Sequence, residues 1–288
     1  MPGATTGRGA PVTMHGADDE AALAAVRTTR LALFRASVLK QAKWRALSAA
    51  IGPTEGLDAL DLGADTGAIS WMFRQQGGRW WSADLTEETV AAITVMVGER
   101  VERLTGASLP FPDAAFDRIV VVDLLEHVDD DRHLLAEIAR CLRPGGFAVL
   151  NIPHQKRWAV LPPIRHAIGL TDAWHGHVRP GYDVAVLERL LPASLRLVRT
   201  STYSRFCSHL LDTALNWAYL RRCRARPTRT TAKGTIITGT AEEAGSARTL
   251  QRLAPLLRAF TSLDALLPWT RGYMLLATVR KRSPSSIA

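Results

Sequence analysis

The sequence predicts an α/β fold in which helices flank a sheet of mainly parallel strands. Short apolar runs alternate with stretches of helical periodicity, which is the pattern of repeated βαβ units. The clearest unit covers residues 56–85, and a further helix is predicted to begin at Thr86 and run to about Arg103. The 288 residues are enough for one such domain with additions. The predicted parallel strands cover 57–62, 80–84, 118–122 and 147–152.

The turn after the first strand and the acid after the second predict a nucleoside site. A right-handed crossover brings both to the carboxyl edge of the sheet, where parallel α/β folds bind ligands. Gly63 and Gly67 let the backbone approach a ligand, and Asp84 can accept hydrogen bonds from two ribose hydroxyls. The turn differs from the GxGxxG of dinucleotide sites because Asp65 stands in its middle. An acid there disfavours a pyrophosphate but suits a cationic nucleoside.

At this stretch the chain resembles the class I S-adenosylmethionine-dependent methyltransferases, whose first motif has the form DxGxGxG. Asp61, Gly63 and Gly67 match the motif, and Asp65 replaces its middle glycine. The resemblance implies a Rossmann-like seven-stranded sheet and S-adenosyl-L-methionine as cofactor. It also implies that Asp61 and the turn hold the methionine end and that Asp84 holds the ribose. The expected cofactor-binding residues are Asp61, Gly63, Ala64, Asp65, Gly67, Asp84, Leu85, Ser108, Leu109 and Asp123.

A second group of motifs resembles the type 11 subfamily of these enzymes. The segment LPFPDAAFD at 109–117 is followed, in the order and spacing of that subfamily, by LEHV at 125–128 and RPGG at 143–146. In the subfamily an acid shortly before LPF binds the adenine amino group, whereas Thr105 lies near this place here. Asp123 is predicted to be either a pocket residue or a strand-end cap.

Helical segments are added to the predicted methyltransferase domain, which covers 51–288. The first 20 residues are polar and are expected to form a disordered tail, and 21–50 has near-helical apolar spacing. The resemblance implies that 21–50 covers the cofactor as a lid. Three of its basic residues either line the cofactor site or form a solvated face: Arg35, Lys40 and Lys43.

A long helical insertion is expected at about 204–271, between predicted strands six and seven at 195–199 and 272–280. The resemblance implies an antiparallel placement of these two strands. An apolar helical face around Trp217 is followed by arginines, and such a helix either lies on a membrane or lipid-like substrate or walls the acceptor pocket. Residues 227–245 are expected to form a loop and 249–267 a helix. The arginines are Arg221, Arg222, Arg224 and Arg226.

The net charge of +9 is concentrated in the second half of the chain. Residues 1–150 contain 15 basic and 20 acidic residues, whereas 151–288 contain 21 and 7. The basic half either faces an anionic acceptor, a membrane or nucleic acid, or is simply solvated. Three scattered cysteines indicate neither a disulfide framework nor a zinc site. Without a secretory signal or an apolar run of about 18 residues, a cytoplasmic protein is expected, with peripheral membrane contact left open.

Three histidines are the predicted general-base candidates, in the order His154, His177 and His127. A base is needed only where the acceptor must lose a proton, because methyl transfer depends mainly on placing the acceptor at attack distance. No metal site is predicted, since His154, His175 and His177 lack a carboxylate or cysteine companion at ligand spacing.

Three functions follow from the sequence, in order of preference. The first is a methyltransferase that acts on a small-molecule or lipid-linked acceptor. The second is a nucleic-acid methyltransferase, for which there is no strong case because no NPPY-like tetrapeptide and no RNA-binding module is present. The third is a catalytically inactive cofactor-binding protein, suggested by Asp65 and Thr105.

Overall fold

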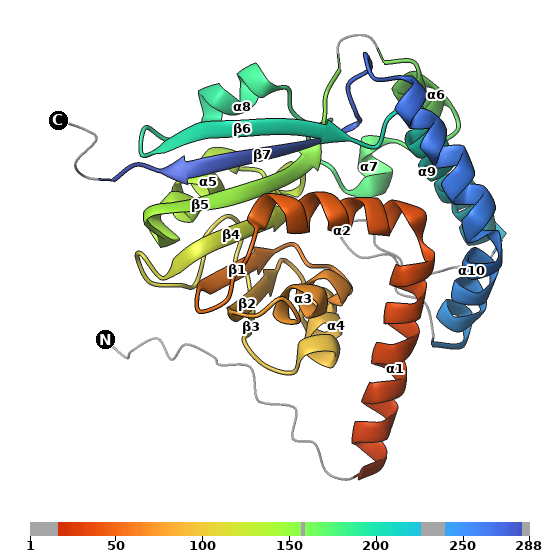
Figure 1. The fold of residues 1–288 in the computed structure, drawn as a ribbon, viewed down its shortest axis with the longest axis horizontal. Helices are drawn as coiled ribbons and strands as arrows, with labels where there is room; N and C mark the ends of the chain where they lie inside the picture. Colours follow the sequence, from red (N-terminus) through yellow and green to blue (C-terminus); the bar gives the residue numbers. More distant parts are fainter. Residues whose placement is uncertain (1–16, 157–158, 226–239, 284–288) are drawn as a thin grey trace, which may run out of the picture.

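A seven-stranded sheet crosses the centre of the molecule, and helices cover both of its faces (Figure 1). The computed structural model describes residues 17–156, 159–225 and 240–283. The strand order is β3-β2-β1-β4-β5-β7-β6. This arrangement confirms the predicted Rossmann-like α/β class.

The strands β1 to β5 are parallel to one another, and β7 runs antiparallel to both of its neighbours, β5 and β6. The parallel strands therefore end at one edge of the sheet, towards α7 and α9 in Figure 1. The bounds are β1 (Asp58–Leu62), β2 (Arg79–Asp84), β3 (Val101–Arg103), β4 (Phe116–Val122), β5 (Leu142–Pro153), β6 (Leu195–Tyr203) and β7 (Met274–Lys281).

The predicted helix from Thr86 to about Arg103 is wrong at its end. Thr86 caps α4 (Glu87–Val97) as expected, but the helix stops at Gly98, which has a φ of 83°. The residues after it form the short edge strand β3, which pairs with β2. The apolar run of α4 hid this boundary, because only the glycine signals it.

The β5 strand also begins earlier than its predicted start at 147. Helix α5 (Asp131–Cys141) ends one residue before β5, so the segment Arg143–Gly146 lies inside the strand. The register between β4 and β5 shifts between Phe116 and Arg118 to accommodate it. The Pro-Gly-Gly sequence therefore produces an irregular strand start rather than a separate turn.

Helices cover the two sheet faces with separate apolar cores. On one face, Leu47 and Ile51 of α2 (Val38–Ile51) and Phe73 of α3 (Ala68–Arg74) pack on Trp80 and Val120. On the other face, α5 and α8 (Val184–Leu190) pack on alternate residues of the same strands. Central strands buried on both faces account for their continuous apolar sequences.

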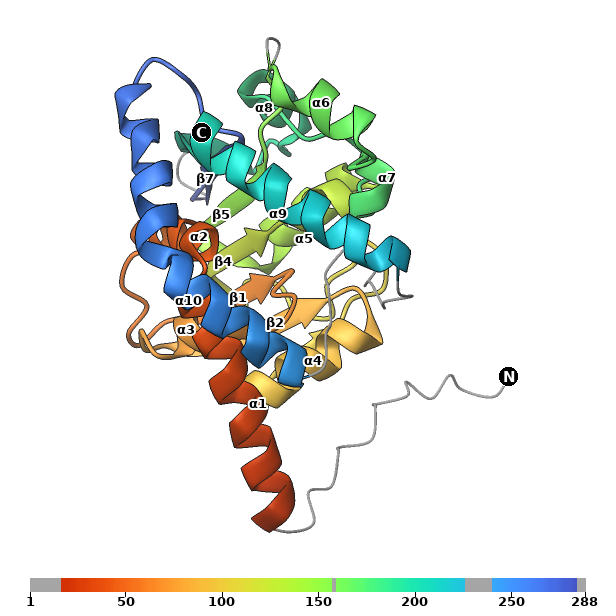
Figure 2. The ribbon, with the colours of Figure 1, turned by 90° about the vertical axis from the view of Figure 1, so that its right-hand side faces the viewer.

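The N-terminal helices connect the sheet to the insertion, because α2 packs on the sheet and the helix before it packs on a helix of the insertion. Helix α1 (Ala17–Ala36) leads into α2 through Ser37, whose side chain accepts a hydrogen bond from the Lys40 N–H and caps α2. Helix α10 (Thr240–Ser262) lies along α1 in both ribbon views (Figures 1 and 2). Of the expected disordered tail, residues 1–16 lie outside the described residues, and 17–20 already belong to α1.

The insertion between β6 and β7 is helical, as predicted. It contains α9 (Phe206–Ala225), α10 and the 3-10 helix η2 (Leu263–Leu266). A loop was expected at 227–245. Residues 227–239 lie outside the described residues, and residues 240–245 belong to α10. The remaining helices are η1 (Leu125–His127), α6 (Leu161–Ala167) and α7 (Asp172–His175).

Within the described part of the chain, no helix combines the length and apolarity that a membrane crossing requires.

Gly67 connects the β1 turn to α3 where α4 packs closely. It has a φ of 79°, and a Cβ atom there would lie 2.8 Å from the Ile93 Cα and 2.9 Å from the Met96 Cβ. Gly98 has a similar φ of 83° but has nothing within 4 Å of such an atom. Both glycines have a positive φ, but only at Gly67 would an added Cβ atom lie close to other atoms.

We expect Gly67→Ala to destabilise the fold more than Gly98→Ala. Each substitution places a side chain at a positive φ, at a cost of about 1–3 kcal/mol. Gly67→Ala should lose about 1–3 kcal/mol more, because its Cβ overpacks the α3–α4 contact. Urea unfolding of both variants measures the difference. Equal losses would mean that α4 moves away without cost.

Candidate functional site

A cleft of about 660 Å³ lies at the carboxyl edge of the parallel strands. The turn after β1 forms one part of its wall, and α2 and the residues after β4 form another. Residues of α6, α7 and α9 and the segment around His177 complete it on the side of the insertion. The cleft thus joins the predicted cofactor turn to the predicted acceptor region.

The turn after β1 keeps a left-handed backbone at its middle position, although glycine is absent there. Asp65 has a φ of 61°, between Gly63 at 83° and Gly67 at 79°. Aspartate tolerates this region better than most residues, so the replacement preserves the backbone path of the motif. Four residues of the turn line the cleft directly: Gly63, Ala64, Asp65 and Thr66.

The Asp84 carboxylate ties this turn to the end of β2. One oxygen accepts the Asp65 N–H at 3.0 Å and the other accepts the Leu85 N–H at 2.7 Å. Asp84 is fully buried. Ribose hydroxyls can therefore reach it only if neighbouring residues shift, which the sequence pattern did not indicate.

Asp61 lies beneath the turn and does not line the cleft. It is fully buried in β1. Burial raises the pKa of its carboxyl, and Arg74, Ser82 and Ser70 partly oppose this effect. From this position Asp61 can support the turn from below but does not reach a ligand in the cleft.

Among the other predicted cofactor residues, Asp123 lines this cleft, whereas Gly67, Leu85, Ser108 and Leu109 lie outside it. The Leu109 N–H donates to Glu137 at 3.0 Å, and the Ser108 hydroxyl lies 3.2 Å from the His133 Nε2. Both contacts hold the LPF segment against α5. Leu85 likewise belongs to the β2 end, where its N–H binds Asp84.

A polar network crosses the cleft from the lid helix to the sheet. Lys43 of α2 forms an ion pair with Asp123, which follows β4 at a φ of 44°. The other Asp123 oxygen accepts the Asn151 Nδ2 at 2.6 Å, and the Tyr203 hydroxyl donates to the Asn151 Oδ1 at 2.7 Å. Burial lowers the pKa of Lys43, but Asp123 and then Tyr203 outweigh it, and the net shift is upward. Lys43 therefore remains a cation.

Two of the three candidate bases meet in the cleft. The His127 and His177 rings lie 4.8 Å apart edge to face, and His175 stacks on His177 at 5.3 Å. Burial lowers the pKa of His177, which makes the neutral ring the dominant form near pH 7. Burial and then Arg165, whose guanidinium lies 3.0 Å from the His175 Nε2, lower the pKa of His175 to about 3.

His154, the first candidate base, occupies another part of the wall. Its Nδ1 lies 2.8 Å from the Gly272 carbonyl oxygen, which fixes the ring, and burial lowers its pKa. Nearby, His209 stacks on Tyr273 at 3.8 Å, and the Lys156 ammonium lies 3.2 Å from the centre of the same ring. Burial lowers the pKa of Lys156 to about 8.

Several residues of the cleft wall and of the polar network behind it were not identified from the sequence. Asn151 could have been noticed as a polar residue in an apolar strand, and Glu126 as the acid beside His127. Arg165 had no local signal. Of the basic lid residues, Lys40 and Lys43 line the cleft, whereas Arg35 is exposed elsewhere.

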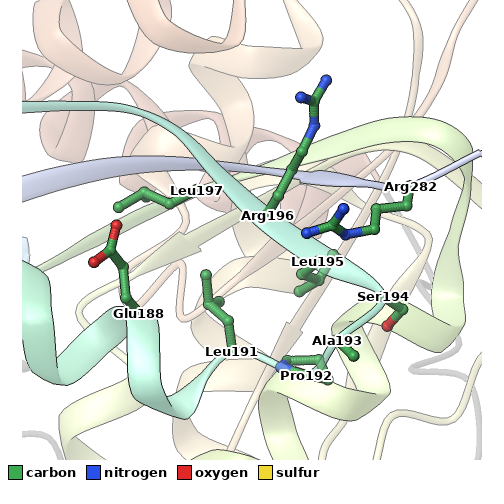
Figure 3. Close-up of a pocket in the computed structure, with 9 residues that line it drawn as sticks. All are labelled: Glu188, Leu191, Pro192, Ala193, Ser194, Leu195, Arg196, Leu197 and Arg282. Carbon is green, nitrogen blue, oxygen red and sulfur yellow. The ribbon is translucent and has the colours of Figure 1, made fainter. Parts of the chain in front are cut away.

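A second hollow lies at the opposite edge of the sheet (Figure 3). It has a volume of about 550 Å³ and is formed by the end of α8 and the start of β6. Arg196 and Arg282 extend over it, with Glu188 at one side. It shares no residue with the cleft and is distant from the carboxyl ends of the parallel strands.

The chain is similar in sequence to known methyltransferases over part of its length. A family model described as a methyltransferase domain matches residues 60–150. Demethylmenaquinone methyltransferase from Tropheryma whipplei (strain Twist) is 34% identical over 127 residues, which are 42% of this chain and 53% of that protein. Ubiquinone biosynthesis O-methyltransferase from Parvibaculum lavamentivorans is 32% identical over 110 residues, 35% of this chain and 44% of its own. The chain spans about half the length of the curated relatives it matches.

Solved structures share the fold over most of the chain. The cyclase SpnF superposes with a TM-score of 0.56 at 19% identity, over 85% of this chain and 82% of its own. An S-adenosylmethionine-dependent methyltransferase from Mesorhizobium loti gives a TM-score of 0.51 at 21% identity, over 83% and 98%. At these identities the likeness shows the fold alone.

We expect His175 to make the folded protein sensitive to acid. The unfolded ring titrates near 6.5, whereas the pKa of about 3 keeps the folded ring neutral. Stability is therefore full above pH 6.5 and falls as the pH drops towards 3. Between pH 7 and pH 5, the wild type should lose about 2 kcal/mol more unfolding free energy than His175→Asn.

Denaturant unfolding at the two pH values measures this effect. The matched control is His166→Asn, since His166 is exposed on α6 of the same cleft wall. The control should follow the wild type. If His175→Asn does so as well, His175 is not the acid-sensitive group.

Proposed function

We propose that this chain is a class I S-adenosylmethionine-dependent methyltransferase of the type 11 family and that it methylates a small-molecule or lipid-linked acceptor. The observation that carries the proposal is the continuity of the cleft. The β1 turn and the helical insertion line the same cavity, so a donor on the turn would meet an acceptor held by the insertion.

The residues at the turn suit a cationic donor. When bound, the cofactor supplies a methyl group on a positively charged sulfur. Gly63, Asp65 and Gly67 have positive φ values, which fix the path of the turn along the cleft, and Asp65 adds a carboxylate to the cleft wall. Asp84 would bind the ribose after the local shift that its burial requires. These features favour a sulfonium over a pyrophosphate ligand.

The acceptor side suits an apolar molecule with a polar reacting group. Pro162, Leu170 and Met274 line the cleft together with the histidines. The relatives named above act, by their names, on demethylmenaquinone or in ubiquinone biosynthesis. An acceptor with an apolar body and an ionisable oxygen is compatible with this lining, and His127 or His177 could take its proton.

Exposed apolar side chains near the insertion support contact with a lipid surface. Leu256 and Leu266 are each 68% exposed and Trp269 is 76% exposed. They follow one another along α10, η2 and the next segment, in the basic half of the chain. Of the predicted arginine cluster, Arg221 lies over the Trp217 ring at 4.2 Å, and the other side chains lie outside the described residues.

An acceptor screen tests the proposed function. Small-molecule extracts of cells that lack the gene should contain the unmethylated acceptor, and the purified protein should transfer a labelled methyl group to it. Transfer to RNA with a steep salt dependence would instead favour the nucleic-acid alternative. Binding of S-adenosylmethionine in a calorimetric titration, without methyl transfer to any component of the extracts, would favour the catalytically inactive cofactor-binding alternative.

We expect Asp84→Ala to weaken binding of S-adenosylmethionine by about 1–3 kcal/mol. The variant removes charge-assisted hydrogen bonds to the ribose and to the Asp65 N–H. Isothermal titration measures the dissociation constant. The matched control is Asp264→Ala, which removes a similarly buried carboxylate that accepts the Cys207 and Ser208 N–H groups away from the cleft. Equal affinity in Asp84→Ala and wild type would remove Asp84 from the site.

We expect the exposed apolar residues to increase binding to anionic vesicles. Burial of each large side chain in the bilayer interface contributes up to about 1.5–3 kcal/mol. Sedimentation with phosphatidylglycerol vesicles should show at least about tenfold weaker partitioning for the triple variant Leu256→Ser, Leu266→Ser, Trp269→Ser. Val198→Ser on β6, where the side chain is also exposed, is the control. Unchanged partitioning of the triple variant would refute the membrane contact.

A further inference from the structure

Glu126, His127 and His177 form a compact group on the cleft wall. One potential ligand atom of each lies within 4.8 Å of those of the other two. All three residues line the cleft, and Glu126 is fully buried. Two imidazoles and one carboxylate are a common ligand set for Zn²⁺ and related transition metals.

The group is assembled by two segments that are tightly bonded to each other. The Val178 N–H donates to the Glu126 carbonyl at 2.9 Å. The Arg179 guanidinium donates to the Leu125 and Val128 carbonyls at 3.0 and 2.8 Å. Since these bonds flank the three side chains, the histidines and the acid are held in place without a ligand. Such preorganisation is what a binding site requires.

The outer contact of His127 suits metal ligation. The His127 Nδ1 lies 3.0 Å from the Gly176 carbonyl, which can only accept, so Nδ1 carries the proton and Nε2 carries the lone pair that a metal ligand needs. The His177 Nδ1 lies 3.9 Å from an Asp172 carboxylate oxygen, which places an acceptor near the ring but beyond direct hydrogen-bond distance.

We propose that Glu126, His127 and His177 bind one divalent transition-metal ion, with Zn²⁺ as the reference ion. Three protein ligands leave a fourth position that faces the cleft. No carboxylate companion at ligand spacing was identified for the histidines from the sequence. Glu126 supplies it, from η1 rather than from the histidine-rich loop.

The fourth position suits an oxygen of the acceptor, and this step rests on the proposed function. Coordination lowers the pKa of an acceptor hydroxyl, whose proton leaves to solvent. The oxygen lone pair forms the new O–CH₃ bond, while the electron pair of the breaking C–S bond stays on the sulfur of the donor. The site therefore points to O-methylation.

Metal titration of the full chain tests the site. The protein is first dialysed against a chelator and then titrated with ZnCl₂ by calorimetry. We expect one ion per chain in the wild type and about 10- to 100-fold weaker binding in His177→Ala. His166→Ala is the matched control, because His166 lines the same cleft outside the group and should leave the affinity unchanged. No stoichiometric binding by the wild type, or equal binding by His177→Ala, overturns the proposal.

Co²⁺ provides a second readout that reports on the ligands. Visible ligand-field bands of the Co²⁺-loaded wild type should change in His177→Ala and in His177→Asn, and circular dichroism should show that both variants are folded. Identical bands in wild type and variants would place the ion elsewhere and overturn the proposal.

Titration with S-adenosylmethionine in the presence of chelator separates this inference from the proposed function. Donor binding without metal binding would retain the methyltransferase and reject the metal site. Metal binding without donor binding would retain the site and reject the proposed function.

Discussion

The order of the parallel strands is the constraint on which the site depends. From β1 the chain builds outwards to β2 and β3, then returns to the other side of β1 to form β4 and β5. The connections after β1 and β4 consequently leave the sheet in different directions, and a crevice opens between them. The glycine turn follows one strand and Asp123 follows the other, so two distant motifs border one cleft.

Charge in this cleft is distributed in a definite way. Lys43 and Asp123 neutralise one another across its centre, which joins the lid helix to the sheet without adding net charge. His175 and His177 are kept neutral by burial. The carboxylates of Asp65 and Glu126 stand on the wall. The resulting cavity suits one ligand with a positive centre and another that can approach neutral imidazoles.

Local motifs predicted most of the fold, because each strand and turn is encoded within a few residues. The glycine turn, the LPF segment and the apolar strand runs placed β1, β2, β4 and the second half of β5 correctly. The end of α4 was wrong, since a single glycine interrupts an apolar run that continues the helical pattern. The three-residue strand β3 is too short to show periodicity.

The site was less predictable, because tertiary contacts determine it. The sequence identified His127 and His177 but could not show that Arg179 brings their segments together. It also could not show that Asp84 is buried behind Asp65, or that Asn151 and Tyr203 extend the Lys43–Asp123 pair. Each of these contacts joins residues that are distant in the sequence, so no local sequence pattern indicates it.

The position of β7 has a consequence for how the molecule is assembled during translation. The seventh strand lies between β5 and β6, and α10, made shortly before it, is the partner of α1. Until the ribosome has released these late segments, β6 lacks its partner strand β7 and α1 lacks its partner helix α10. A nascent chain can complete the first four parallel strands early, but closure of both the sheet and the lid has to wait, and contacts of such long sequence separation form slowly.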